Sequence, residues 1–295
     1  MQGKTVLITG STAGIGKETA RGLAIRGASV ILVGLDTIEA RQAVHEISRD
    51  AGHDRVQALV ADITSRDGLA QLASQVAECS DSLDVLINNV GLNLPARQLT
   101  ADGVERMFAA HVLAPFTLTH LLLPQLRRAG AARVINITGG IPGGPIERDN
   151  LQAERRFMGW TFSQYNHTKT MTMAMTYRLA QELAGTGVTA NVAYPGHGYT
   201  PMNKSTAIKA FPMVYRPIAP LVLKVIAPLF LSDLTRSARP SVYLASSHEV
   251  EGISGAYFDH KGRHRPWPAS VLDERNRNAL WELCTRLSAD TLQNA

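Results

Sequence analysis

The chain has 295 residues, 45% of them apolar, which is enough for one large α/β core or two small domains. The formal net charge is +5, but the basic residues are scattered rather than interleaved with aromatic ones, which argues against a nucleic-acid-binding protein. The two cysteines, Cys79 and Cys284, lie far apart, so the sequence predicts neither a disulfide framework nor a metal site.

The longest apolar tract, residues 217–231, is broken by Lys224 and by prolines. It is too short to cross a membrane, because a helical span needs about 20 apolar residues. The first ten residues lack the basic and apolar regions of a signal peptide. We therefore expect a cytoplasmic protein without a membrane span.

Short β-branched runs alternate along the chain with stretches whose apolar residues have helical spacing. The second of these helical stretches opens with a capping-box pattern, Asp36 and Glu39. In chain order, the predicted strands are 5–9, 29–33, 56–60, 84–88, 133–138, 188–194 and 256–259. The predicted helices are 14–27, 36–50, 65–78, about 100–128 with bends at Pro115 and Pro124, and about 163–184.

This alternation predicts an α/β fold of the Rossmann type, a doubly wound parallel sheet of about seven strands with helices on both faces. No linker, repeat or low-complexity tract divides the chain, so we expect residues 1–295 to form a single nucleotide-binding domain. The irregular segments 139–162 and 197–235 follow the fifth and sixth strands. They should lie at the carboxyl edge of the sheet, where ligands bind in such folds, with 197–235 as a substrate lid.

The first turn between strand and helix, TGSTAGIG at residues 9–16, is rich in glycine. Glycines allow a tight turn and let a pyrophosphate approach the N-terminus of a helix closely. Directly after an N-terminal strand, this pattern favours a dinucleotide site over a glycine turn with a purely structural role.

A second motif, YNHTK, places Tyr165 and Lys169 one helical turn apart, so that their side chains share a face. A lysine ammonium beside a phenol stabilises the phenolate and lowers the pKa of the tyrosine. This would make Tyr165 a general acid or base near neutral pH. The alternative is a chance pair on a solvated helix.

With these motifs the chain resembles the short-chain dehydrogenase/reductase family, and within it the retinol-dehydrogenase-like subset. The resemblance covers nearly the whole chain, from KTVLITG to YFDHKG. Its motifs occur in the family's order: TGSTAGIG (9–16), AD (61–62), NNVG (88–91), PFTLTHLLLP (115–124), RVINIT (133–138), YNHTK (165–169), PGHGYT (195–200) and YLASS (243–247).

The resemblance implies an NAD(P) site and a role for each matching residue. Lys169 would bind the nicotinamide ribose and tune Tyr165, which would exchange a proton with the substrate oxygen while the cofactor carries the hydride. The residues implied to hold the cofactor are Gly10, Thr12, Gly14, Ile15 and Gly16 at the pyrophosphate and ribose, Asp62 and Ile63 at the adenine, Asn88, Asn89 and Gly91 beside the central strands, Pro195, Gly196 and Thr200 at the carboxamide, and Tyr165 and Lys169 themselves.

The chain departs from the family pattern at two catalytic positions. The serine that ends the family's fifth strand is Gly139 here, preceded by Thr138, and neighbouring strand residues point to opposite faces. Thr138 would replace the serine only where the strand end twists or bulges. The family's asparagine in the long helix is His111. It could continue a proton relay, donate a proton itself, or fill the asparagine's space with hydrogen bonds to the backbone.

The end of the second strand predicts which nicotinamide cofactor is preferred. An acidic residue there accepts the adenosine ribose hydroxyls of NAD, and a nearby arginine favours the phosphate of NADP. Here the acidic position is Gly34, the arginine position is Leu35, and Asp36 fits better as a helix cap. Lys17 is either a phosphate partner or an exposed helix charge. Without a repelling carboxylate, the sequence favours NADP(H) over NAD(H).

The leading interpretation is an NAD(P)-dependent oxidoreductase that interconverts a hydrophobic ketone or aldehyde and an alcohol, with Tyr165, Lys169, Thr138 and His111 at its catalytic centre. The apolar segment 197–231 suits a sizeable hydrophobic substrate or, equally, a subunit interface. Two alternatives stay open: a non-redox cyclase, isomerase or dehydratase acting on a specialised metabolite, and a nucleotide-binding protein without catalysis. The resemblance also implies a homodimer or homotetramer formed through the long helices.

Overall fold

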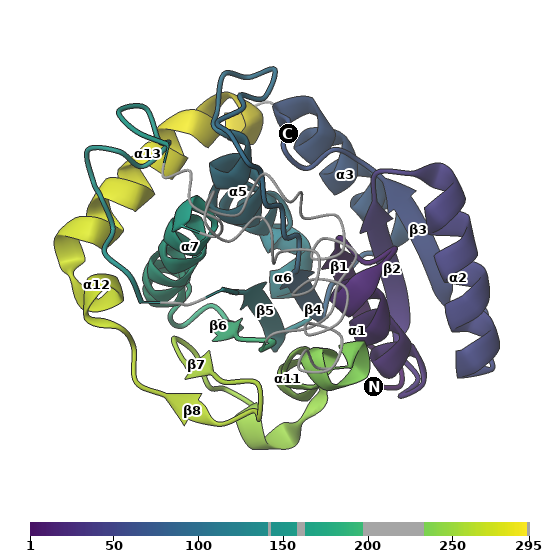
Figure 1. The fold of residues 1–295 in the computed structure, drawn as a ribbon. Coiled ribbons are helices and arrows are strands. Elements are labelled where there is room, and N and C mark those ends of the chain that lie inside the picture. Colours follow the sequence, from purple (N-terminus) through teal and green to yellow (C-terminus); the bar gives the residue numbers. More distant parts are fainter. Residues whose placement is uncertain (141–142, 158–162, 197–232, 294–295) are drawn as a thin grey trace, which may run out of the picture.

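The computed structural model describes residues 1–140, 143–157, 163–196 and 233–293 (Figure 1). Eight strands form one sheet in the order β3-β2-β1-β4-β5-β6-β7-β8. Neighbouring strands pair in parallel, except for the antiparallel pair β7 and β8. The strands are β1 (Thr5–Thr9), β2 (Ser29–Gly34), β3 (Val56–Val60), β4 (Val85–Asn88), β5 (Ala132–Ile137), β6 (Val188–Ala193), β7 (Tyr257–Phe258) and β8 (His264–Arg265).

The predicted doubly wound parallel sheet is confirmed, with one strand more than expected. The additional strand, β8, consists of His264 and Arg265, which are both exposed. Two exposed polar residues at an edge carry no apolar alternation, so the pattern that predicts the other strands is absent there.

The helices between the strands are α1 (Gly14–Ala24), α2 (Thr37–Ala51), α3 (Arg66–Cys79), α4 (Arg106–Phe108), α5 (Ala114–Leu121), α6 (Leu123–Arg128) and α7 (Ser163–Glu182). A π-helical turn, η1 (Ala109–Leu113), joins α4 to α5. The predicted helix 100–128 is therefore four shorter pieces. Pro115 and Pro124 both lie in the first turn of a piece, where the missing N–H leaves no hydrogen bond unmade.

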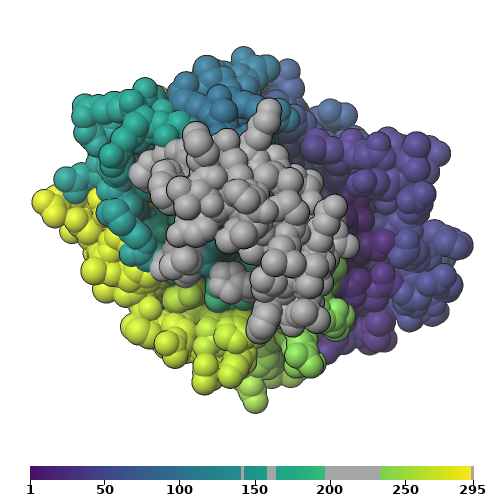
Figure 2. Space-filling model, viewed as in Figure 1, coloured from purple at the N-terminus to yellow at the C-terminus, as the bar shows by residue number. Residues whose placement is uncertain are grey.

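Helices cover both faces of the sheet (Figure 1). One face carries α1 and α2, together with α11 (Leu234–Ser246), which packs along α1. The other face carries α3, α5 and α7, and outside these lies α13 (Glu274–Gln293), which follows the short helix α12 (Ala269–Leu272). In Figure 2 the N-terminal and C-terminal elements lie on opposite flanks of the face shown. Neither α11 nor α13 was among the predicted helices.

The C-terminal helix α13 covers the long helices α5 and α7. The ring of Trp281 packs edge-on against Phe116, with 4.9 Å between ring centroids, and lies 5.8 Å from the ring of His120. Leu280 and Cys284 on the same helix are fully buried. A dimer through α5 and α7, as the family resemblance implies, would therefore require α13 to move away from them.

Among the described residues, none of the helices combines the length and the apolar character that a membrane crossing requires.

Candidate active site

The glycine-rich turn between β1 and α1 lies where the strand order reverses, because β1 pairs with both β2 and β4. Gly10 and Gly14 have φ angles of +62° and +60°, a backbone region that favours glycine. A Cβ on Gly16 would overlap the carbonyl oxygen of Gly10. The turn therefore needs glycine at these positions to bring the backbone close to the N-terminus of α1.

Asn89, directly after β4, ties this turn to the neighbouring strand. Its Nδ2 atom donates to the carbonyl oxygens of Thr9 (3.1 Å) and Gly10 (3.0 Å), and its backbone N–H donates to Thr9 Oγ1 (3.0 Å). Ser11, inside the turn, accepts a hydrogen bond from the backbone N–H of Val33 on β2. The first turn of α1 holds no acidic residue. This rigid cradle at a helix N-terminus fits the pyrophosphate of a dinucleotide.

Gly34, the last residue of β2, has no side chain that could bind or repel a ribose phosphate. A Cβ on Gly34 would overlap the methyl group of Thr12. Asp36 accepts from the backbone N–H groups of Ile38 and Glu39, both at 2.8 Å, as the N-cap of α2. This confirms the predicted cap. Lys17 forms an ion pair with Glu46 (2.8 Å) and so has a protein partner for its charge.

The residues implied for the adenine lie in the turn after β3. Asp62 is partly buried, and its Oδ1 atom accepts from the backbone N–H and the hydroxyl of Thr64. Ile63 is buried among the apolar residues beneath α3. The Asp62 carboxylate therefore shapes its own turn, at the same edge of the sheet as the glycine turn.

Tyr165 and Lys169 lie together in the first half of α7, and both are almost fully buried. The Nζ atom of Lys169 lies 5.9 Å from the centroid of the Tyr165 ring, and it donates to the carbonyl oxygens of Val90 (3.2 Å) and Ile137 (3.0 Å). The pair is therefore buried in the fold and does not lie on a solvated helix face.

The direction of the Tyr165 pKa differs from the prediction. Burial, followed by the nearby phenol of Tyr194, raises the pKa of Tyr165 above its ordinary value. Burial also lowers the pKa of Lys169 to about 7. A lysine that is partly neutral near pH 7 stabilises a phenolate little, so Tyr165 keeps its proton.

His111 lies in the π-helical turn η1, and its ring packs edge-on against Tyr165 with 5.3 Å between ring centroids. Its Nε2 atom accepts from the backbone N–H of Leu92 (2.9 Å), so Nδ1 carries the proton and donates to Thr168 Oγ1 (2.8 Å). Burial, followed by the charge of Lys169, lowers the pKa of His111 well below its ordinary value. Both ring nitrogens are occupied, so the geometry favours the structural role among the three alternatives.

Thr138 faces the helix α7 rather than the hydroxyl of Tyr165. Its Oγ1 atom donates to the carbonyl oxygen of Lys169 (3.2 Å), and its side chain is buried. The position that faces the Tyr165 hydroxyl is Gly139, where a Cβ would lie 2.5 Å from the oxygen. Positions 138 and 139 therefore point to opposite faces, as neighbouring strand residues ordinarily do. This placement argues against contact between Thr138 and the substrate.

The other predicted site residues fall partly outside the described chain. Pro195 and Gly196 follow β6, and Gly196 has a φ angle of +75° next to His260. Gly91 is exposed after β4, two residues beyond Asn89. Thr200 lies outside the described residues, as does the predicted substrate lid except for its last three positions.

Comparisons with known proteins agree with this arrangement. A family model described as short chain dehydrogenase matches residues 4–148. Retinol dehydrogenase 13 from Homo sapiens is 32% identical over 286 residues, which cover 97% of this chain and 84% of that protein. The chain belongs to the short-chain dehydrogenase/reductase family. As a member of this family it is an NAD(P)-dependent oxidoreductase.

One further relative and one solved structure show similar degrees of likeness to this chain. Retinol dehydrogenase 14 from Homo sapiens is 34% identical over 297 residues, covering 96% of this chain and 85% of that protein. The structure of Pseudomonas aeruginosa RhlG in an NADP active-site complex has 27% identity and a TM-score of 0.67, covering 89% of this chain and 96% of that chain.

Sequence reasoning missed two features of this short-chain dehydrogenase/reductase. One is Tyr194, which follows β6 and whose hydroxyl donates to the carbonyl oxygen of Gly140 (3.2 Å). The other is a buried polar ladder, in which Asn88 donates to Asn136 and Asn136 donates to Thr176, both at 2.8 Å. A tyrosine directly before the Pro-Gly pair was a visible signal for the first. The ladder joins three elements that are distant in sequence, and no local pattern reveals it.

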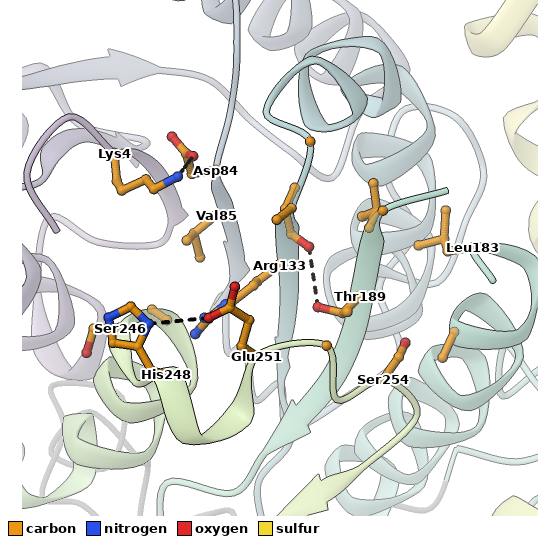
Figure 3. Close-up of a pocket in the computed structure, with 18 of the residues that line it drawn as sticks. Lys4, Asp84, Val85, Arg133, Leu183, Thr189, Ser246, His248, Glu251 and Ser254 are labelled. Atoms are coloured by element: carbon orange, nitrogen blue, oxygen red, sulfur yellow. Dashed lines mark hydrogen bonds and ion pairs between the residues drawn. The ribbon is translucent and has the colours of Figure 1, made fainter. Parts of the chain in front are cut away.

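A cavity of about 880 Å³ opens at the amino edge of the sheet, opposite the glycine turn (Figure 3). Its charged side chains already have protein partners. Lys4 pairs with Asp84 at 2.8 Å, and Arg133 donates to two carbonyl oxygens at the end of α11. The Tyr165–Lys169 pair lies at the other edge, so this cavity is not the catalytic site of the short-chain dehydrogenase/reductase.

Proposed function

We propose that this oxidoreductase interconverts a hydrophobic ketone or aldehyde and the corresponding alcohol. The observation that carries the proposal is the buried pair of Tyr165 and Lys169, at the same edge of the sheet as a glycine turn that fits a dinucleotide. The hydrophobic substrate class is supported by the relatives named retinol dehydrogenases and by the apolar composition of residues 217–231.

The proton chemistry follows from the two buried side chains. Bound NAD(P)(H) supplies or accepts the hydride. Tyr165 keeps its proton at neutral pH because burial raises its pKa, so it can donate that proton to the oxygen of a carbonyl substrate. Lys169, with a pKa lowered to about 7, gains or loses a proton near neutral pH. It can therefore take up a proton when Tyr165 has given its own away and carries a negative charge. This state of the pair suits carbonyl reduction.

In this proposal His111 and Thr138 support the centre rather than donate protons. His111 fixes the loop after β4 through Leu92 and the helix α7 through Thr168. Thr138 binds the backbone of Lys169 and so holds the helix against β5. Both side chains therefore act on the position of Tyr165 and Lys169.

NADP(H) is the proposed cofactor, with a modest preference over NAD(H). The support is the absence of a carboxylate that could repel a phosphate, since Gly34 stands at that position and Asp36 is held as a helix cap. The ion pair of Lys17 with Glu46 removes the cation that would strengthen the preference. Fluorescence titrations with NADPH and NADH measure it directly.

The proposal is tested with NADPH carrying deuterium at the transferable C4 position, and with all-trans-retinal and acetophenone as probe substrates. We expect deuterium in the alcohol product and a loss of roughly 10²–10⁴-fold in kcat for Tyr165→Phe. Tyr177→Phe, on the same helix α7, is the matched control and should keep its activity. Product without deuterium would instead support the non-redox alternative. A folded protein that binds neither cofactor would contradict both the redox proposal and the cofactor assignment.

A further inference from the structure

Two tyrosines reach the same short segment after β5, which consists of Gly139 and Gly140 and which we call the diglycine step. Tyr165 comes from α7, and its hydroxyl oxygen lies 2.5 Å from the position of a Cβ on Gly139. Tyr194 comes from the end of β6, and its hydroxyl donates to the carbonyl oxygen of Gly140 at 3.2 Å. Because β5 and β6 are adjacent parallel strands, their carboxyl ends bring both phenols to one place.

The diglycine step has no room for side chains of its own. A Cβ on Gly140, which has a φ angle of +65°, would overlap Oδ1 of Asn166. A serine at position 139 would push its Cβ against the Tyr165 hydroxyl. A serine at position 139, as in the family pattern, would therefore require Tyr165 to move from its observed position.

Tyr194 is held at its backbone, and its hydroxyl reaches the diglycine step through the hydrogen bond to Gly140. Its N–H donates to the carbonyl oxygen of Phe258 on β7 (2.9 Å), and its ring stands edge-on to His260 with 6.5 Å between ring centroids. The side chain is partly exposed, unlike that of Tyr165. A substrate oxygen at the diglycine step can therefore compete with the carbonyl of Gly140 for the Tyr194 hydroxyl.

Both phenols are neutral O–H donors at physiological pH. Burial raises the pKa of Tyr194, as it does that of Tyr165. The nearby phenol of Tyr194 is the second cause that raises the pKa of Tyr165, so the two groups lie close enough to interact. Two neutral O–H groups that reach neighbouring glycines of one backbone segment are suited to donate to the same substrate oxygen.

We propose that Tyr194 is a catalytic residue whose hydroxyl donates the second hydrogen bond to the substrate oxygen, in place of the serine that Gly139 replaces. This inference rests on the proposed function. In the reduction direction, the carbonyl carbon gains the hydride of the reduced nicotinamide and the carbonyl oxygen gains the proton of Tyr165. Tyr194 keeps its own proton and stabilises the negative charge that develops on the oxygen.

The test is Tyr194→Phe, which keeps the ring and removes only the hydroxyl. Loss of one donor to a developing oxyanion lowers kcat by roughly 10²-fold or more in other enzymes, and we expect that loss here with all-trans-retinal or acetophenone as the probe. The dissociation constant for NADPH and the melting temperature should stay unchanged. Tyr243→Phe is the matched control, since Tyr243 lies on α11 and its hydroxyl donates to Glu249 (2.9 Å), and it should keep its activity.

Three results would overturn the inference, and they can be told apart. A Tyr194→Phe enzyme within about threefold of the parent, while Tyr165→Phe is inactive, leaves the proposed function intact but removes Tyr194 from the mechanism. A loss of activity that is explained by weaker NADPH binding assigns Tyr194 to cofactor binding instead. A parent enzyme that transfers no deuterium to either probe contradicts the proposed function, and the inference falls with it.

Discussion

The hydroxyl oxygen of Tyr165 lies 2.5 Å from the position that a Cβ on Gly139 would occupy. Glycine at this place is therefore a condition for the observed position of the catalytic phenol. A larger residue at position 139 must displace the tyrosine, since a Cβ does not approach an oxygen so closely.

Gly139→Ala should lower kcat by roughly 10²-fold, because the added methyl group moves the Tyr165 hydroxyl away from the substrate oxygen. NADPH binding should change little, since the glycine turn lies after another strand. Steady-state kinetics and a fluorescence titration check the two parts. Gly144→Ala is the control, because a Cβ there meets no atom within 4 Å. Equal effects of the two variants would contradict the geometric argument.

His111→Asn should flatten the acid dependence of stability. Below pH 6.5, the ordinary pKa of histidine, the unfolded chain binds a proton on His111 that the folded chain does not, because burial lowers the folded pKa. Stability therefore falls as the pH drops below 6.5, by about 1.4 kcal/mol per pH unit for one such group. In the variant, the free energy of unfolding should depend less steeply on pH, by the contribution of one proton. Denaturant unfolding between pH 5 and 7 measures this dependence. A variant that keeps the slope of the parent protein would contradict the buried, neutral state of His111.

Asn89→Ala should weaken cofactor binding about tenfold, a factor that corresponds to about 1.4 kcal/mol. The substitution removes the two hydrogen bonds from Nδ2 to the carbonyl oxygens of Thr9 and Gly10, which hold the glycine turn against β4. Stability should also fall by about 1–3 kcal/mol. Asn278→Ala, exposed on α13, is the control for the loss of an amide. Undiminished NADPH binding in Asn89→Ala would show that the turn keeps its shape without these bonds.

Substituting both Gly34 and Thr12 should change the preference of the protein between NADPH and NADH. Gly34→Asp alone should impair binding of both cofactors, because its Cβ overlaps the Thr12 methyl group. Combined with Thr12→Gly, the new carboxylate has room and should shift the ratio of dissociation constants toward NADH by about tenfold or more, through repulsion of the phosphate of NADPH. Parallel titrations of the parent and both variants measure the shift. A double variant that still prefers NADPH would contradict the role given to position 34.

Trp281→Ala should destabilise the chain by about 3 kcal/mol, because the ring packs against Phe116, His120 and the guanidinium of Arg178. Glu282→Ala, exposed on the same helix, should have little effect on stability.

Light scattering on the parent protein tests the separate prediction that the protein is a homodimer or homotetramer. A dimer lost only in Glu282→Ala or other surface variants of α13 would place the interface on that helix rather than on α5 and α7.

The sequence by itself determined the doubly wound sheet, the glycine turn and the Tyr165–Lys169 pair. Each rests on local signals: β-branched runs, helical spacing, glycines directly after a strand, and a four-residue interval on one helix. These signals keep their meaning in the folded chain because strand, turn and helix geometry fix the relative positions of residues that are close in sequence.

Only the tertiary structure decided what surrounds the pair. Burial by distant elements raises the pKa of Tyr165 and lowers that of Lys169, so burial decides the protonation state of both groups. The hydrogen bonds of His111, the approach of Tyr194 to Gly140 and the cover of α13 over α5 all join segments that are far apart along the chain. Such contacts follow from how the layers pack, and a pattern read along one segment carries no information about its neighbours in space.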